Sequence, residues 1–85
     1  MTYAQLSKEL TAHRRISRGF RIPLATLDEY SDYIQNDTHR KIFRDWYIAR
    51  LSMPLMQIEY DYSPFAIEYI LRKCKRKIIE GLNNE

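Results

Sequence analysis

The chain has 85 residues, of which 45% are hydrophobic and 29% charged, and its formal net charge is +3. This length predicts one domain over residues 1–85, near the size at which a single core is only just sufficient, and the composition excludes a disordered chain. No stretch approaches the roughly 20 apolar residues of a membrane span, and the one cysteine, Cys74, excludes an intrachain disulfide and a thiolate metal cluster. We therefore expect a soluble cytoplasmic protein with no cofactor and no metal.

The first half of the chain reads as a helix followed by a strand. Residues 2–17 have apolar residues at three- and four-residue spacing, including Leu6 and Leu10, and Thr2 can cap this helix. From residue 18 to residue 24 the apolar residues alternate with others, which predicts a short strand that ends near Pro23.

Two helices follow this strand. Thr26 and Glu29 have the spacing of a capping box, so the second helix should begin at Thr26. Its inward positions are predicted to be Leu27, Tyr30 and Ile34. A third helix, capped by Asp37 or Thr38, should run to about Ser52, with a broad buried face formed by Ile42, Phe43, Trp46, Tyr47 and Leu51.

The last third of the chain predicts a second strand and a long helix. Pro54 ends the third helix, and residues 55–61 alternate with a period of two, which is typical of a strand. Ser63 followed by Pro64 is a strong helix start, and this helix should end at Gly81. Its buried face is predicted to be Ile67, Ile70, Leu71, Cys74 and Ile78. The predicted fold class is α+β, mostly helical, with about four helices and two short strands whose uncovered edges favour a homodimer.

Four arginines form a first basic block, with no carboxylate between Glu9 and Asp28. They are Arg14, Arg15, Arg18 and Arg21. Arginine binds phosphate with two parallel hydrogen bonds and stacks on bases, so this block favours an anionic partner. The alternative is pairing within the chain, for which Arg21 with Glu59 or Asp61 across paired strands is the best candidate.

The last helix carries a second basic block, with five basic residues among six. These are Arg72, Lys73, Lys75, Arg76 and Lys77. Arg72 and Arg76 share a helix face and can meet successive phosphates, while Tyr69, one turn earlier, offers a ring for stacking. The alternative is a solvated face that complements the helix dipole. We predict that both basic blocks, together with Tyr69, bind nucleic acid, with RNA favoured over DNA.

Catalysis has little support in the sequence. His13 and His39 are the only histidines, and their spacing does not resemble that of a metal site. A histidine beside arginines could serve a ribonuclease, but no nucleophile accompanies His13, and there is no glycine-rich phosphate loop. We therefore predict no enzyme activity and no catalytic residue.

Residues 18–51 resemble a ribbon-helix-helix unit in the order of their predicted elements: a short strand, a proline near its end, an acidic-capped helix, a turn and a second helix. That family forms intertwined dimers and reads the DNA major groove with outward side chains of paired strands. The resemblance implies that Gly19 and Arg21 face outward. The chain departs from the family at the turn, where Asn36 and Asp37 replace the usual glycine.

In size, basic blocks and its seven tyrosines, the chain also resembles small accessory proteins of T4-like phages that disarm host factors, one type being an RNA-binding antagonist of a toxin–antitoxin ribonuclease. The sequence thus favours a non-enzymatic RNA-binding inhibitor or regulator. The alternatives are a ribbon-helix-helix-like DNA-binding repressor and a protein-only inhibitor of a host enzyme.

Overall fold

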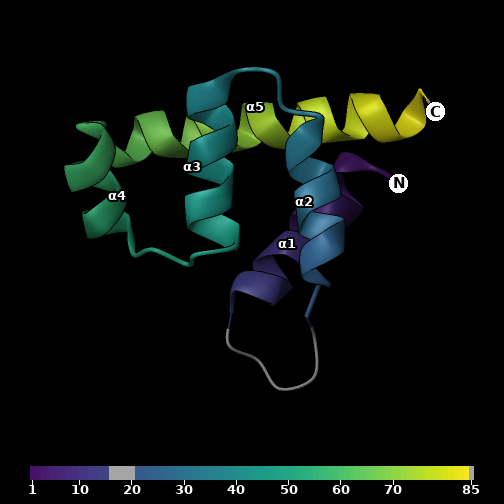
Figure 1. Ribbon diagram of the computed structural model, residues 1–85, viewed down its shortest axis with the longest axis horizontal. Helices are drawn as coiled ribbons and strands as arrows, with labels where there is room; N and C mark the ends of the chain where they lie inside the picture. The colour runs from purple at the N-terminus through teal and green to yellow at the C-terminus, as the bar shows by residue number, and fades with distance from the viewer. Residues whose placement is uncertain (16–20, 85) are drawn as a thin grey trace.

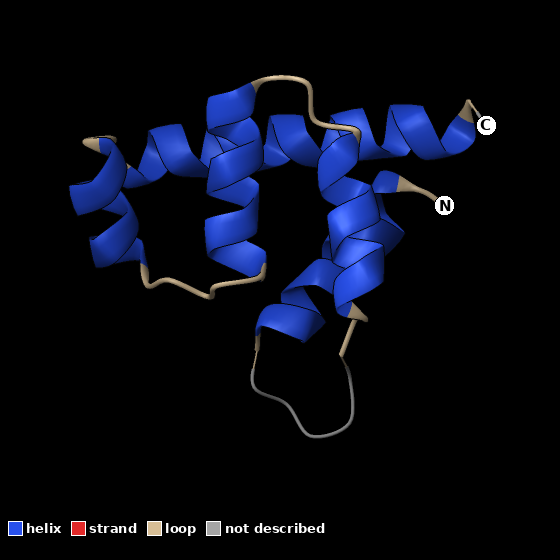
Figure 2. Ribbon diagram, viewed as in Figure 1, coloured by secondary structure: helices blue, strands red, loops and turns tan. Residues whose placement is uncertain are grey.

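The computed structural model describes residues 1–15 and 21–84, and within them the regular secondary structure is entirely helical (Figures 1 and 2). In chain order the helices are α1 (Tyr3–Arg14), α2 (Leu24–Asp32), α3 (Asp37–Tyr47), α4 (Met53–Tyr60) and α5 (Pro64–Asn83). The predicted α+β fold with two short strands is therefore wrong.

The second predicted strand, residues 55–61, lies almost entirely in α4. Met56 is fully buried, whereas Ile58 is 79% exposed, so two residues that a strand would place on one face lie on opposite sides. Ser52 caps α4 by accepting a hydrogen bond from the N–H of Leu55, and Pro54 lies in the first turn. Seven residues make only two helical turns, and alternation over so short a window does not distinguish a strand from a helix.

The first predicted strand lies partly outside the described residues. Residues 21–23 have no regular secondary structure, and α2 begins at Leu24 with Pro23 as its N-cap, so the predicted capping box of Thr26 does not form. Ile22 is buried, and its backbone N–H donates to Nδ1 of His13 over 3.0 Å. A histidine side chain thus accepts the hydrogen bond that a neighbouring strand would otherwise accept.

Helix starts marked by a hydroxyl side chain are confirmed at both ends of the chain. Thr2 caps α1 in a capping box completed by Gln5, and Ser63 caps α5 with Pro64 in its first turn. α3 instead begins one residue earlier than predicted, with Asn36 as its cap, and it ends at Tyr47 rather than near Ser52.

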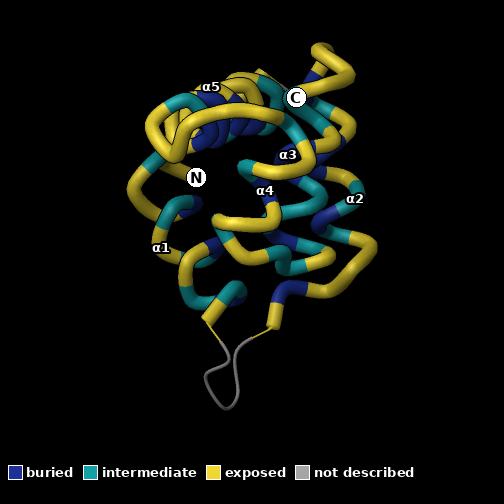
Figure 3. The backbone as a smooth tube through the Cα atoms, turned by 90° about the vertical axis from the view of Figure 1, so that its left-hand side faces the viewer, coloured by how far each residue is buried: buried dark blue, intermediate teal, exposed yellow. Residues whose placement is uncertain are grey.

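The longest helix, α5, lies across α1, α3 and α4, while α2 packs against α3 (Figure 1). The inward faces predicted for α2 and α5 are confirmed, since all their residues are buried. Buried positions lie where helices face one another, and exposed positions follow the outer side of α5 (Figure 3). Within residues 1–15 and 21–84, no helix combines the length and apolar character needed to cross a membrane.

Candidate nucleic-acid interface

The last turn of α1 is joined to the C-terminal end of α3. Arg14 donates to the backbone oxygens of Trp46 and Leu51 over 2.7 and 2.8 Å, and His13 Nε2 lies 3.0 Å from the backbone oxygen of Tyr47. The last carbonyls of a helix have no partner within the helix, and cationic donors there also interact favourably with the helix dipole. These two residues therefore cap α3 from a different helix.

The guanidinium of Arg14 also covers the indole of Trp46. Its Cζ lies 3.3 Å from the ring centroid, a close cation–π contact. Burial lowers the pKa of Arg14, and the nearby charge of Arg50 lowers it further, although an arginine stays protonated at neutral pH. Arg14 is half-buried, because its side chain lies between α1, α3 and the loop after α3.

His13 is buried, and both of its ring nitrogens face backbone groups. Nδ1 accepts a hydrogen bond from the N–H of Ile22, so the proton of the neutral ring must lie on Nε2, which donates to Tyr47. Burial lowers the pKa of His13 in spite of the opposing hydrogen bond to Tyr47, and the charges of Arg50 and Arg21 lower it further. The ring therefore serves as a neutral connector between three segments.

An open pocket of about 470 Å³ lies beside these capping contacts. Its lining includes Arg14, Arg15 and Arg50, together with Trp46 and Tyr47. Burial raises the pKa of Tyr47 to about 12, so its hydroxyl remains a neutral hydrogen-bonding group. A pocket that combines aromatic surface with three guanidinium groups is suited to a planar anionic ligand.

These arginines are not neutralised by acidic side chains. Among residues 1–15 and 21–84, none of Arg14, Arg15, Arg21 and Arg50 forms an ion pair with a carboxylate. Arg21 instead donates to the backbone oxygen of His13 over 3.1 Å, and Glu59, one of its two predicted partners, pairs with Lys41. The end of α1 is therefore an uncompensated cluster of positive charge.

A second pocket of about 370 Å³ is lined partly by α5, and Trp46 and Tyr47 line both pockets. We call the two pockets together the groove. Arg72 and Lys75 line its α5 end, where Glu68 is the one acidic lining residue. Aromatic side chains thus lie in the middle of the groove, with basic groups at both ends.

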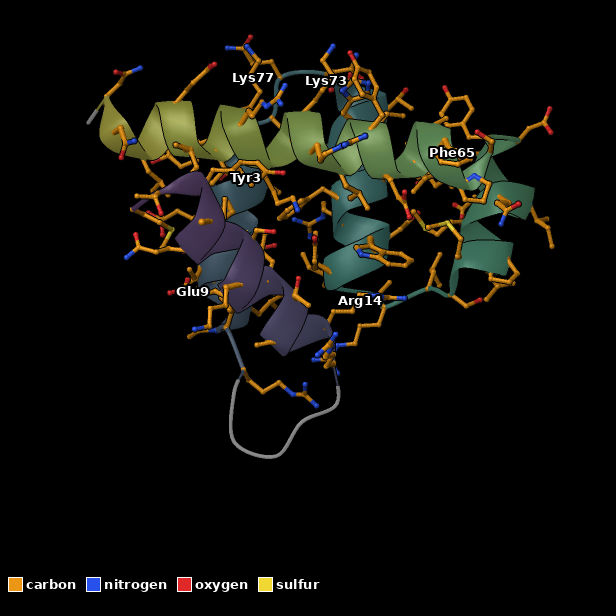
Figure 4. All side chains as sticks on the ribbon, turned by 180° about the vertical axis from the view of Figure 1, so that it is seen from behind. Tyr3, Glu9, Arg14, Phe65, Lys73 and Lys77 are labelled. Carbon is orange, nitrogen blue, oxygen red and sulfur yellow. The ribbon has the colours of Figure 1, made fainter. Side chains whose placement is uncertain are left out.

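The second basic block divides between two sides of α5. Lys75 points toward α1, where it donates to Ser7 Oγ over 3.1 Å and lies 5.3 Å from the ring centroid of Tyr3. Lys73 and Lys77 lie on the side of α5 opposite Arg14 (Figure 4). Lys77 pairs with Glu80, whereas Arg72 and Arg76 make no ion pair within the described residues.

The ten predicted nucleic-acid-binding residues therefore do not form one surface. Arg14, Arg15, Arg72 and Lys75 line the groove, Arg21 lies near its arginine-rich end, and Arg18 lies outside the described residues. The remaining four belong to the outer part of α5: Tyr69, Lys73, Arg76 and Lys77.

Three groove residues on which the argument depends were not predicted as site residues, namely Trp46, Tyr47 and Arg50. Trp46 had been assigned to the buried face of α3, and its four-residue spacing to Arg50 was the available signal that they could share a face. Arg50 lies after α3 with a φ of 57°, in the left-handed region that non-glycine residues rarely adopt.

Comparison with known proteins gave no match to a protein-family model, to a curated protein or to a solved structure. The part of the chain that the structure describes also contains no group of three or more potential metal ligands. The functional argument accordingly rests on the geometry of the groove.

Proposed function

We propose that the protein binds single-stranded RNA in the groove without cleaving it. The observation that carries this proposal is the pocket in which Arg15 and Arg50, neither paired with a carboxylate, flank Trp46 and Tyr47. Guanidinium groups contact phosphates with paired hydrogen bonds, and the part of the Trp46 ring that Arg14 leaves uncovered offers a surface for a base.

The shape of the site favours a single strand over a duplex. A recess of about 470 Å³ is large enough for one nucleotide, and the second pocket of about 370 Å³, which shares Trp46 and Tyr47 with it, can take the next nucleotide. Proteins that recognise RNA commonly take unpaired bases into such recesses, whereas duplexes are contacted from outside through their grooves.

The backbone at Arg50 supports a role for its side chain. A non-glycine residue in the left-handed region costs about 1 kcal/mol or more, and such residues cluster at functional sites. Arg50 makes no hydrogen bond or ion pair within the described residues that would offset this cost. Its guanidinium is therefore available to a ligand of the pocket that it lines.

The non-catalytic part of the proposal is supported by His13. Both of its ring nitrogens are bonded to backbone groups and the ring is buried, so it has no free nitrogen for proton transfer to a substrate. A binder that leaves RNA intact acts by occupying it, which is the action of an inhibitor or regulator. We place this action in the cytoplasm, in keeping with the buried free thiol of Cys74.

The proposal can be tested with the intrinsic fluorescence of Trp46, the one tryptophan of the chain. A 12-nucleotide single-stranded RNA of mixed sequence should change the Trp46 emission as it binds. Replacement of both Arg15 and Arg50 by glutamine should raise the dissociation constant at least tenfold. It should also lower the salt dependence by about one to two units, following the rule of roughly 0.7 units per phosphate contact of a single strand.

The matched control is the double replacement Lys73→Gln and Lys77→Gln, which removes the same charge from the opposite side of α5 (Figure 4). It should leave RNA binding within about threefold of the unmodified protein. The proposal fails if the control weakens binding as much as the groove variant does, or if a 12-base-pair DNA duplex binds as tightly as the single-stranded RNA.

A further inference from the structure

The outer face of α5 exposes large apolar surface beside strong charge. We define this face as Phe65, Glu68, Tyr69, Arg72, Lys73 and Arg76, which lie opposite the buried residues of the helix. Phe65 is 82% exposed and Tyr69 is 53% exposed. Phe65 and Tyr69 are one helical turn apart, so their exposed rings adjoin on this face, and adjoining exposed apolar side chains mark a candidate interaction surface.

Charge is arranged asymmetrically along this face. Along this face, Phe65, Glu68 and Tyr69 occupy the N-terminal half, and the basic residues Arg72, Lys73 and Arg76 occupy the C-terminal half. Two copies of α5 packed in parallel would therefore place like charges together. Two antiparallel copies would place opposite charges together and would also oppose the two helix dipoles.

We propose that the outer face of α5 is a homodimer interface in which two copies of this helix pack antiparallel about a two-fold axis. If the axis passes between Ile70 and Leu71, Glu68 of one copy faces Arg72 of the other. In the same register Phe65 faces Arg76, and Tyr69 faces Lys73. Each contact is made twice, as an interface with two-fold symmetry requires.

The aromatic pairs extend a contact that already exists within one copy. Lys73 Nζ lies 5.3 Å from the ring centroid of Tyr69, so this ring already attracts a cation from its own helix. In the dimer the same ring gains the corresponding lysine of the second copy. Arg76 has no ion-pair partner among the described residues of its own chain, and its long stem can cover Phe65 of the second copy.

The two-fold axis has a consequence for the groove. It runs perpendicular to both copies of α5, so the flank that carries Arg72 and Lys75 lies on the same side in each copy. Both grooves then open on one side of the dimer. Glu68 and Arg72 belong both to this interface and to the α5 end of the groove, so the dimer would narrow that end. The dimer is therefore tested in the absence of nucleic acid, and the Arg15 and Arg50 variant tests RNA binding separately.

Charge reversal tests the interface after bound nucleic acid has been removed with nuclease and high salt. Sedimentation equilibrium of the full chain from 1 to 200 µM should give a dimer. Glu68→Arg and Arg72→Glu should each raise the dimer dissociation constant at least tenfold, because each places like charges opposite one another. An equimolar mixture of the two variants should regain dimers within about threefold of the original affinity, since both cross-pairs are then attractive.

Two further variants keep the test decisive. Glu29→Arg makes the same change of charge on α2 and should leave the dimer intact, whereas Phe65→Ser should weaken it. Circular dichroism verifies that each variant is folded, and the residues changed are all exposed. The proposal is overturned by a monomer mass across the whole range, by a dimer that persists in both single charge variants, or by a mixture that stays monomeric.

Discussion

At the scale of the residue, His13 connects three segments of the chain through one neutral imidazole. Its Nδ1 accepts from Ile22, and its Nε2 donates to Tyr47 at the end of α3. A proton added at Nδ1 would point at the N–H of Ile22 and break that hydrogen bond. The neighbouring guanidinium groups of Arg21 and Arg50 further disfavour a charged ring.

Stability should therefore fall as the pH is lowered through about 6.5. Because the pKa of His13 is lowered in the folded chain, the unfolded chain binds the proton first, and its uptake pulls the equilibrium toward unfolding. The contribution of one histidine is at most about 1.4 kcal/mol per pH unit. Urea unfolding at pH 7.5, 6.5 and 5.5 measures this slope.

His13→Gln should flatten this dependence, since glutamine keeps a donor for Tyr47 but does not titrate. The pKa of His39 is lowered too, by burial and by the charge of Lys73, so His39→Gln measures the second contribution. An unchanged slope in His13→Gln would contradict the prediction.

The sequence indicated that arginine is concentrated near His13, but it did not show which side chains are free. The capping role of Arg14 depends on Trp46 and Leu51, which are 32 and 37 residues away in the chain. Contacts at that separation depend on the packing of whole helices and leave no local pattern. Arg15, the adjacent residue, has the opposite environment and is exposed.

At the scale of the element, α5 continues past the glycine at which it was predicted to end. Gly81 lies inside the helix, where the ring of Tyr33 rests against its backbone. The glycine therefore provides space for a neighbouring ring rather than a helix stop. The sequence could not show this, because Tyr33 lies in the turn after α2.

Gly81→Ala should destabilise the protein, although alanine in an open helix is about 1 kcal/mol more favourable than glycine. A Cβ at this position would lie 2.6 Å from Cγ of Tyr33 and closer still to Cδ1, so the ring must leave its site. Thermal unfolding measures the change. In a Tyr33→Ala background the same substitution should become neutral or stabilising, and a loss of stability in both backgrounds would contradict this explanation.

The helices with long periodic faces were predictable, and the short elements were not. The buried face of α5 repeats over about three turns, and all of its predicted residues are buried. α4 has eight residues, with Met56 as its fully buried position, so packing against α5 rather than local pattern determines its structure. The ribbon-helix-helix resemblance stays a prediction, and its two helices correspond to α2 and α3.

At the scale of the whole molecule, segregated charge was visible in the sequence, but its division between two surfaces was not. The turn after α3 brings Arg50 to the first basic block, and the rotation of α5 directs Lys75 and Lys73 to different sides. The dimer was first expected from uncovered strand edges. That reason disappears with the strands, and the outer face of α5 supplies a different one.

The uncompensated arginines should lower the stability of the unliganded protein. Four guanidinium groups near the end of α1 repel one another across a screening length of about 30 Å at 0.01 M salt. In a site that binds anions, this repulsion is present in the free protein and is reduced when the ligand binds. Arginines with a structural role would instead stabilise the fold. When the arginines are replaced, the free energy of unfolding should rise in the first case and fall in the second.

We therefore expect the double replacement Arg15→Gln and Arg50→Gln to raise the free energy of unfolding while it abolishes RNA binding. At 0.01 M salt the gain should be a few tenths to about 1 kcal/mol, and it should vanish near 0.5 M salt, where the charges are screened. Glutamine, like arginine, has the cost of the left-handed backbone conformation at position 50. The increase in the free energy of unfolding therefore measures the effect of removing charge. Urea unfolding of both proteins at the two salt concentrations provides the measurement. A variant that is less stable at both salt concentrations would show that these arginines stabilise the fold. That result would contradict the proposal that the groove binds an anionic ligand.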